Sequence, residues 1–88
     1  MARKYVVKGR VQGVGFRAFV QYAADSLDIR GWTRNSDDGS VEVYAVGTPE
    51  QLSALSAYLW RGPRMAIVRH VDEMEAAVEE WSDFQIRF

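Results

Sequence analysis

The hydrophobic residues of this 88-residue chain change their spacing along the sequence, from every second residue to every third or fourth and back. The first spacing is typical of a β-strand with one buried face, and the second is typical of an amphipathic helix. Alternation of the two predicts an α+β fold in which helices cover a sheet. A chain of this length has room for one modest core, so we expect a single domain over residues 1–88.

The first strand and the first helix are predicted from their buried faces. Residues 4–11 alternate, with Tyr5, Val7 and Val11 on one face and basic side chains mostly on the other. The helix that follows has an apolar stripe at i, i+3, i+4, i+7 and i+11. This stripe consists of Phe16, Phe19, Val20, Ala23 and Leu27.

The middle of the chain predicts a hairpin and then a second helix. Residues 29–35 and 40–46 have strand character and flank Asp38-Gly39, a strong signal for an antiparallel hairpin. Thr48-Pro49-Glu50-Gln51 supplies an N-cap, a proline at the first helical position and a glutamine at the third. Leucines 52, 55 and 59 would form the buried side of this helix, and Gly62-Pro63 would end it.

The remaining strands are predicted over 66–71 and 84–88, with an acidic segment between them that we expect to be a solvated surface. The resulting order is β-α-β-β-α-β with a short terminal strand. This is the ferredoxin-like plan, a sandwich with an antiparallel sheet and two helices on one of its faces.

The stretch GRVQGVGFR, residues 9–17, lies where the first strand leads into the first helix. Helix N-termini expose backbone N–H groups that Ser, Thr, Asp or Asn normally caps, and none of these occurs between Gly9 and Ala24. Glycines allow positive φ angles, so the loop can turn its N–H groups inward to bind an anion. An anion would then act as the missing cap.

Arg17 strengthens this interpretation. A cation in the first turn of a helix opposes the helix dipole by roughly 0.3–1 kcal/mol, and such locally unfavourable choices are expected at functional sites. In the predicted topology Asn35 lies at the same edge of the sheet, two strand spacings of about 4.8 Å from the loop. A phosphate and one water would fill that gap. The glycine spacing matches neither the dinucleotide motif nor the P-loop.

GRVQGVGFR and GWTRNSDDGSV resemble the two signature segments of the acylphosphatase family, and the resemblance extends over essentially the whole chain, including RGPRMAIV and SDFQIRF. The matching positions are the glycines with Val11, Gln12, Phe16, Arg17, Trp32, Asn35, Gly39 and Val41. Thr33 and Asp28 depart from the family pattern. Thr33 has the shape of valine, and Asp28 affects the end of the first helix more than the chemistry.

The resemblance implies hydrolysis of the carboxyl-phosphate bond in small acyl phosphates. Arg17 would bind the phosphate, Asn35 would position the water, and the 11–17 loop would hold the phosphate oxygens. The phosphate-binding residues are then Gln12, Gly13, Val14, Gly15, Phe16 and Arg17. No metal or cofactor is expected, and inorganic phosphate would inhibit as the product.

Two other functional classes are possible for a chain with this order of strands and helices. RNA-recognition domains place aromatic residues on their strands, but VGFRAFV spans a loop and a helix start, and SVEVYAV has only Tyr44. A non-catalytic anion-binding or regulatory module is the main alternative. His70 is the only histidine and is predicted to lie within a strand. The chain therefore has few residues from which a metal site or a Ser-His-Asp triad could be built.

Composition limits the partners and the compartment. The net charge of −1 argues against nucleic acid, although residues 1–36 carry +5 and residues 37–88 carry −6. The absence of cysteine excludes disulfides and thiolate sites. The sequence has neither a signal-like apolar run at its start nor a membrane-length apolar run. We therefore expect a cytoplasmic protein. We also expect a monomer, although composition does not reveal the oligomeric state.

Overall fold

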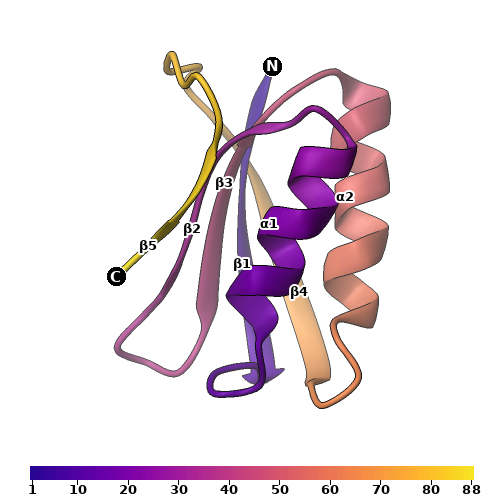
Figure 1. Cartoon of the computed structure of the whole chain (residues 1–88), viewed down its shortest axis with the longest axis vertical. Helices are drawn as coiled ribbons and strands as arrows, with labels where there is room; N and C mark the ends of the chain where they lie inside the picture. Colours follow the sequence, from indigo (N-terminus) through magenta and orange to yellow (C-terminus); the bar gives the residue numbers. More distant parts are fainter.

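The computed structural model describes all residues, 1–88, and contains a five-stranded sheet with two helices. The elements are β1 Ala2–Arg10, α1 Phe16–Ser26, β2 Arg30–Asn35, β3 Val41–Val46, α2 Pro49–Arg61, β4 Ile67–Ala76 and β5 Phe84–Arg87. Figure 1 shows both helices on the same face of the sheet, as the ferredoxin-like plan predicts. No helix is both long and apolar enough to cross a membrane.

The strand order β4-β1-β3-β2-β5 places β3 between β1 and β2. Both of these strands pair antiparallel with β3, so they run parallel to each other and end at the same edge of the sheet, as predicted. β5 pairs with β2 in the parallel sense, which makes the sheet mixed. The β2–β5 pair brings residues near the end of the chain beside the C-terminal end of β2.

The core lies between the sheet and the helices. The inward-facing residues of β1 and β3, including Tyr5, Val7, Val41 and Val43, are fully buried against the three helix leucines. The predicted stripe of α1 is partly correct: Phe16, Val20 and Ala23 are buried, whereas Phe19 and the C-cap Leu27 are only half-buried. Burial raises the pKa of Tyr5 to about 12, and its hydroxyl donates to the carbonyl of Leu52.

The acidic segment differs from its prediction. Its first five residues continue β4 to Ala76 and pair along β1. The strand is stable there because basic side chains of β1 neutralise it: Lys8 lies 2.9 Å from Asp72, and Arg3 lies 4.0 Å from Glu73. The prediction that this strand ends at about residue 71 was therefore wrong, since cross-strand charge pairs stabilise the sheet as far as Ala76. Residues 73–75 are exposed, as expected of a solvated surface.

Candidate active site

The loop between β1 and α1 has the conformation that its glycines permit. Gly13 and Gly15 have φ angles of 73° and 78°, in the left-handed region that disfavours other residues. Gly15 is the N-cap of α1, and no side chain caps this helix. The backbone N–H groups of residues 12–18 have no acceptor within the protein. A row of unpaired donors thus lies at a helix N-terminus, a place suited to binding phosphate.

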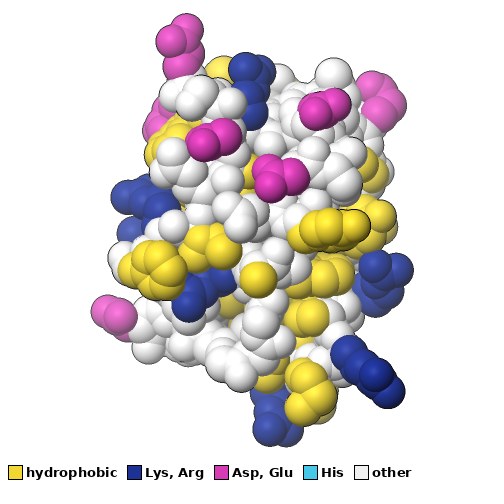
Figure 2. Space-filling model, in the orientation of Figure 1, with side chains coloured by type: hydrophobic (Ala, Val, Ile, Leu, Met, Phe, Trp, Pro, Cys, Tyr) yellow, Lys and Arg dark blue, Asp and Glu magenta, His cyan; other side chains and the backbone are white.

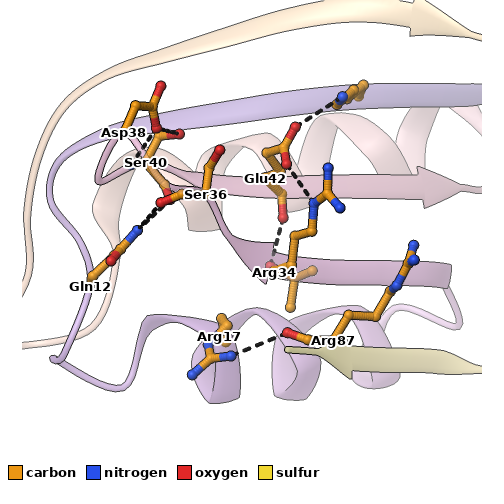
Figure 3. A network of polar contacts seen from close by, with 10 residues as sticks. Gln12, Arg17, Arg34, Ser36, Asp38, Ser40, Glu42 and Arg87 are labelled. Carbon is orange, nitrogen blue, oxygen red and sulfur yellow. Dashed lines mark hydrogen bonds and ion pairs between the residues drawn. The ribbon is translucent and has the colours of Figure 1, made fainter.

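Arg17 extends from the first turn of α1 towards the last residues of the chain. One of its terminal nitrogens, Nη1, donates to the carbonyl of Arg87 at 3.2 Å, as Figure 3 shows. The guanidinium carbon also lies 4.8 Å from the centroid of the Phe88 ring. These contacts hold the guanidinium beside the loop and leave four of its five N–H donors for a ligand.

Asn35 is the last residue of β2 and is exposed. No hydrogen bond within the protein engages its side chain, although the hairpin that follows is closed by a bond from the Ser36 N–H to the Ser40 carbonyl. A structural hairpin asparagine would be expected to bond its own turn. Here Asp38 does so, because its carboxylate accepts from the N–H and hydroxyl of Ser40, and these bonds lower its pKa.

A cleft of about 210 Å³ joins these groups. Its walls are Val11, Gly13, Gly15, Phe16, Arg17, Ala18, Asn35, Ile86 and Phe88. The structure therefore brings five of the seven predicted site residues into one cleft. A larger hollow of about 540 Å³ lies around Arg30, Val46 and residues 78–82, at the opposite end of β2 from Asn35.

Gln12 and Val14 do not face the cleft with their side chains. The Gln12 amide donates to the carbonyls of Ser36 and Ser40 at 2.7 and 2.9 Å, which ties the loop to the hairpin (Figure 3). Val14 is half-buried and packs against the core. Neither residue lines the cleft, although their backbone N–H groups have no acceptor within the protein.

Ile86 and Phe88 are cleft residues that were not predicted from the sequence. They reach the site because β5 pairs with β2 in register, Thr33 opposite Ile86. The ending SDFQIRF indicates a strand but carries no sign of its partner. No group of three or more His, Asp or Glu side chains is arranged to hold a metal ion.

Comparisons with known proteins indicate the same family over nearly the full chain. A family model described as acylphosphatase matches residues 3–86. An acylphosphatase of Solibacter usitatus is 55% identical over 86 residues, which is 98% of this chain and 90% of that protein. The crystal structure of acylphosphatase from Bacillus subtilis superimposes with a TM-score of 0.95 at 35% identity, covering 99% of this chain and 98% of that one.

The same fold also occurs within a larger protein. Full-length HypF, in a phosphate- and nucleotide-bound form, aligns with a TM-score of 0.87 at 30% identity. The match covers 99% of this chain but only 12% of that one.

Proposed function

Because this chain belongs to the acylphosphatase family, whose activity is the hydrolysis of acyl phosphates, we propose that the 11–17 loop, Arg17 and Asn35 perform that hydrolysis. The observation that carries the assignment is the row of backbone N–H groups at residues 12–18, which have no acceptor in the protein and belong to a segment that lines the cleft together with Arg17. Phosphate oxygens are the acceptors that suit such a row.

Arg17 binds the phosphoryl group in this proposal. Its planar guanidinium can hold two oxygens at once and stays charged at any ordinary pH. Phosphoryl transfer depends mainly on positioning and on stabilising charge spread over the phosphoryl oxygens. The helix N-terminus and the guanidinium supply that stabilisation from two directions.

Asn35 orients the attacking water. The water oxygen bonds to phosphorus, the bond between phosphorus and the carboxyl oxygen breaks, and the carboxylate leaves with the electron pair. A carboxylate is a good leaving group, so no general acid is required. An amide is too weak a base to take the proton, which passes instead to an oxygen of the substrate's own phosphate.

The proposal extends to the partners and the setting of the enzyme. Residues 1–88 act as one domain, without metal or cofactor, on small acyl phosphates, and inorganic phosphate inhibits as the product. We further propose a cytoplasmic monomer that does not bind nucleic acid. The net charge of −1 and the absence of cysteine support this setting.

A hydrolysis assay tests the proposal directly. Purified protein is incubated with acetyl phosphate, with and without EDTA, and phosphate release is followed against the uncatalysed rate. We expect equal turnover in both conditions, since the cleft has no metal ligands at suitable spacing. Loss of activity in EDTA that a divalent ion restores would overturn metal independence. Phosphate binding without turnover would favour the non-catalytic anion-binding alternative.

A further inference from the structure

The cleft has two chemically different parts. One part contains the backbone donors, Arg17 and Asn35, and suits the phosphoryl group. The other part is apolar and comes from β5 and the residue after it, Ile86 and Phe88. The Phe88 ring is fully exposed at the mouth of the cleft, and Ile86 is half-buried beside it. An exposed phenylalanine ring at such a place is available to a ligand.

The position of the ring is compatible with a phosphate bound to Arg17. The ring lies over the guanidinium, at 4.8 Å from its carbon, whereas phosphate oxygens bind N–H groups along the guanidinium edge. Stacking and phosphate binding therefore use different parts of the same group. A substrate whose phosphate occupies the edge carries its acyl group within reach of the Phe88 ring.

We propose that Ile86 and Phe88 form an acyl-group subsite that selects acyl phosphates with an apolar, and above all an aromatic, acyl group. The inference rests on the proposed function, because it requires the phosphate to lie against Arg17. Of the other apolar cleft residues, Val11 and Phe16 are 1% and 2% exposed and offer a ligand almost no surface. Ala18 is exposed but contributes only a methyl group. Contact with the acyl group thus falls mainly to Ile86 and Phe88.

A purely positioning role for Phe88 makes a different prediction. If the ring only held the guanidinium in place, its removal would weaken the hydrolysis of every acyl phosphate by the same factor. A subsite weakens the hydrolysis of bulky apolar substrates more than that of the smallest one. The two roles are separated by comparing acetyl phosphate with benzoyl phosphate.

The experiment measures kcat and KM for both substrates in the wild-type protein, Phe88→Ala, Phe88→Leu and Ile86→Ala. Tyr22→Ala, which removes a 78% exposed ring from α1, is the matched control. We expect Phe88→Ala to lower the ratio of benzoyl to acetyl kcat/KM by about tenfold, mainly through KM, because aromatic contact contributes about that much to binding. Phe88→Leu should restore part of the ratio, Ile86→Ala should lower it, and Tyr22→Ala should leave it unchanged.

An unchanged ratio in Phe88→Ala overturns the subsite, whether both activities fall together or neither falls. Circular dichroism and phosphate affinity of each variant show that the fold and the phosphate site persist. If the wild-type protein hydrolyses neither substrate, the proposed function itself fails. If it hydrolyses both with no preference for benzoyl phosphate, only the subsite fails.

Discussion

The electrostatics of α1 alone do not explain why an arginine occupies position 17. It is a cation near the positive end of the α1 dipole, where an acidic residue would be favoured, and α1 has no acid in its first turn. The Arg87 carbonyl and the Phe88 ring hold the guanidinium in place. A bound phosphate would reverse the unfavourable electrostatics, because its charge lies next to both the arginine and the helix N-terminus.

Replacing Arg17 and replacing Asn35 are predicted to affect phosphate affinity and turnover differently. Arg17→Ala removes the group that holds the phosphate in both ground and transition states, so phosphate affinity and turnover should both collapse. Arg17→Lys should also perform poorly, because a point charge cannot reproduce the two-oxygen fork. Asn35→Ala leaves the loop and the arginine intact, so kcat should fall strongly while phosphate affinity is nearly retained.

Steady-state kinetics and phosphate titration of the three variants measure these effects. Near-normal kcat in Asn35→Ala would show that this residue does not orient the water. A folded Asn35→Ala protein that loses phosphate affinity as severely as Arg17→Ala would show that the two roles are not separate.

The two helices differ in how their N-termini are completed. Thr48 accepts from the N–H of Gln51, and the Gln51 side chain accepts from the N–H of Thr48, so α2 has a full capping box. α1 begins at Phe16 after the N-cap Gly15 and has no side-chain cap. The N-terminus of α2 is therefore capped by residues of its own first turn, whereas the N-terminus of α1 is uncapped beside the candidate site.

Inorganic phosphate is predicted to cap the N-terminus of α1 and not that of α2. In hydrogen exchange, saturating phosphate should slow the amides of residues 13–18 and leave the first turn of α2 unchanged. The melting temperature should rise as well, because a ligand at 100 times its dissociation constant stabilises the fold by about 2.7 kcal/mol. A melting temperature that does not change with phosphate, or equal protection of both helices, would contradict a phosphate site at α1.

Glu42 links three strands on the face of the sheet that the helices leave open. Its carboxylate lies 3.0 Å from Lys4 of β1 and 2.6 Å from Arg34 of β2. Partial burial of Glu42 opposes its ionisation, but hydrogen bonds from Arg34 and Lys4 outweigh burial and lower its pKa. The ionised group thus stabilises the pairing of β1, β3 and β2.

This pKa shift predicts how stability depends on pH. A lowered pKa in the folded state means that the contribution is present above the unfolded-state pKa, about 4.3, and is lost as the pH falls through the folded value. Glu42→Gln should therefore cost about 1.5 kcal/mol at pH 7, the lower end of the range for hydrogen bonds to charged groups, because Lys4 and Arg34 are partly exposed to solvent. Urea unfolding at pH 7 and pH 3 measures the cost. A difference between the proteins as large at pH 3 as at pH 7 would contradict the ion-pair role.

Charge is unevenly distributed over the face of the molecule that Figure 2 shows. Most of the acidic side chains in view lie in the upper half, and several Lys or Arg side chains project from the lower half, although basic side chains also lie near the top and at mid-height. The segment between α2 and β4 lies at the lower end, next to the loop that precedes α1. Ile67 at the start of β4 pairs with Arg10 at the end of β1. Gly62 lies so close to Phe16 that an added Cβ would be 3.0 Å from its ring. It carries Arg64, so basic charge lies at the same end of the molecule as the 11–17 loop.

Such an arrangement is predicted to attract anionic substrates. Arg64→Glu should lower kcat/KM several-fold at low ionic strength with little change in kcat, and the difference should shrink as salt screens the field. Arg30→Glu, at the opposite end of β2, is the control with the same change in net charge. Equal losses in both variants, or a loss that salt does not reduce, would show that the basic end does not steer the substrate.

Local sequence was sufficient for the elements and for the central part of the site. The Thr48–Gln51 cap, the Asp38-Gly39 hairpin and the uncapped glycine loop each act through neighbours within a few residues, so their conformations could be predicted from local chemistry. Gly13, Gly15, Arg17 and Asn35 could be assigned to one site because the strand order follows from a handedness rule.

Long-range pairing determined the rest. The fourth strand extends through acidic residues because β1 lies beside it and supplies Lys8 and Arg3, a neighbour that no local pattern reveals. Ile86 and Phe88 join the cleft only because β5 adds in parallel to β2 at the edge of the sheet. Such contacts depend on which distant segments meet, and a strand's own alternation is the same whichever partner it pairs with.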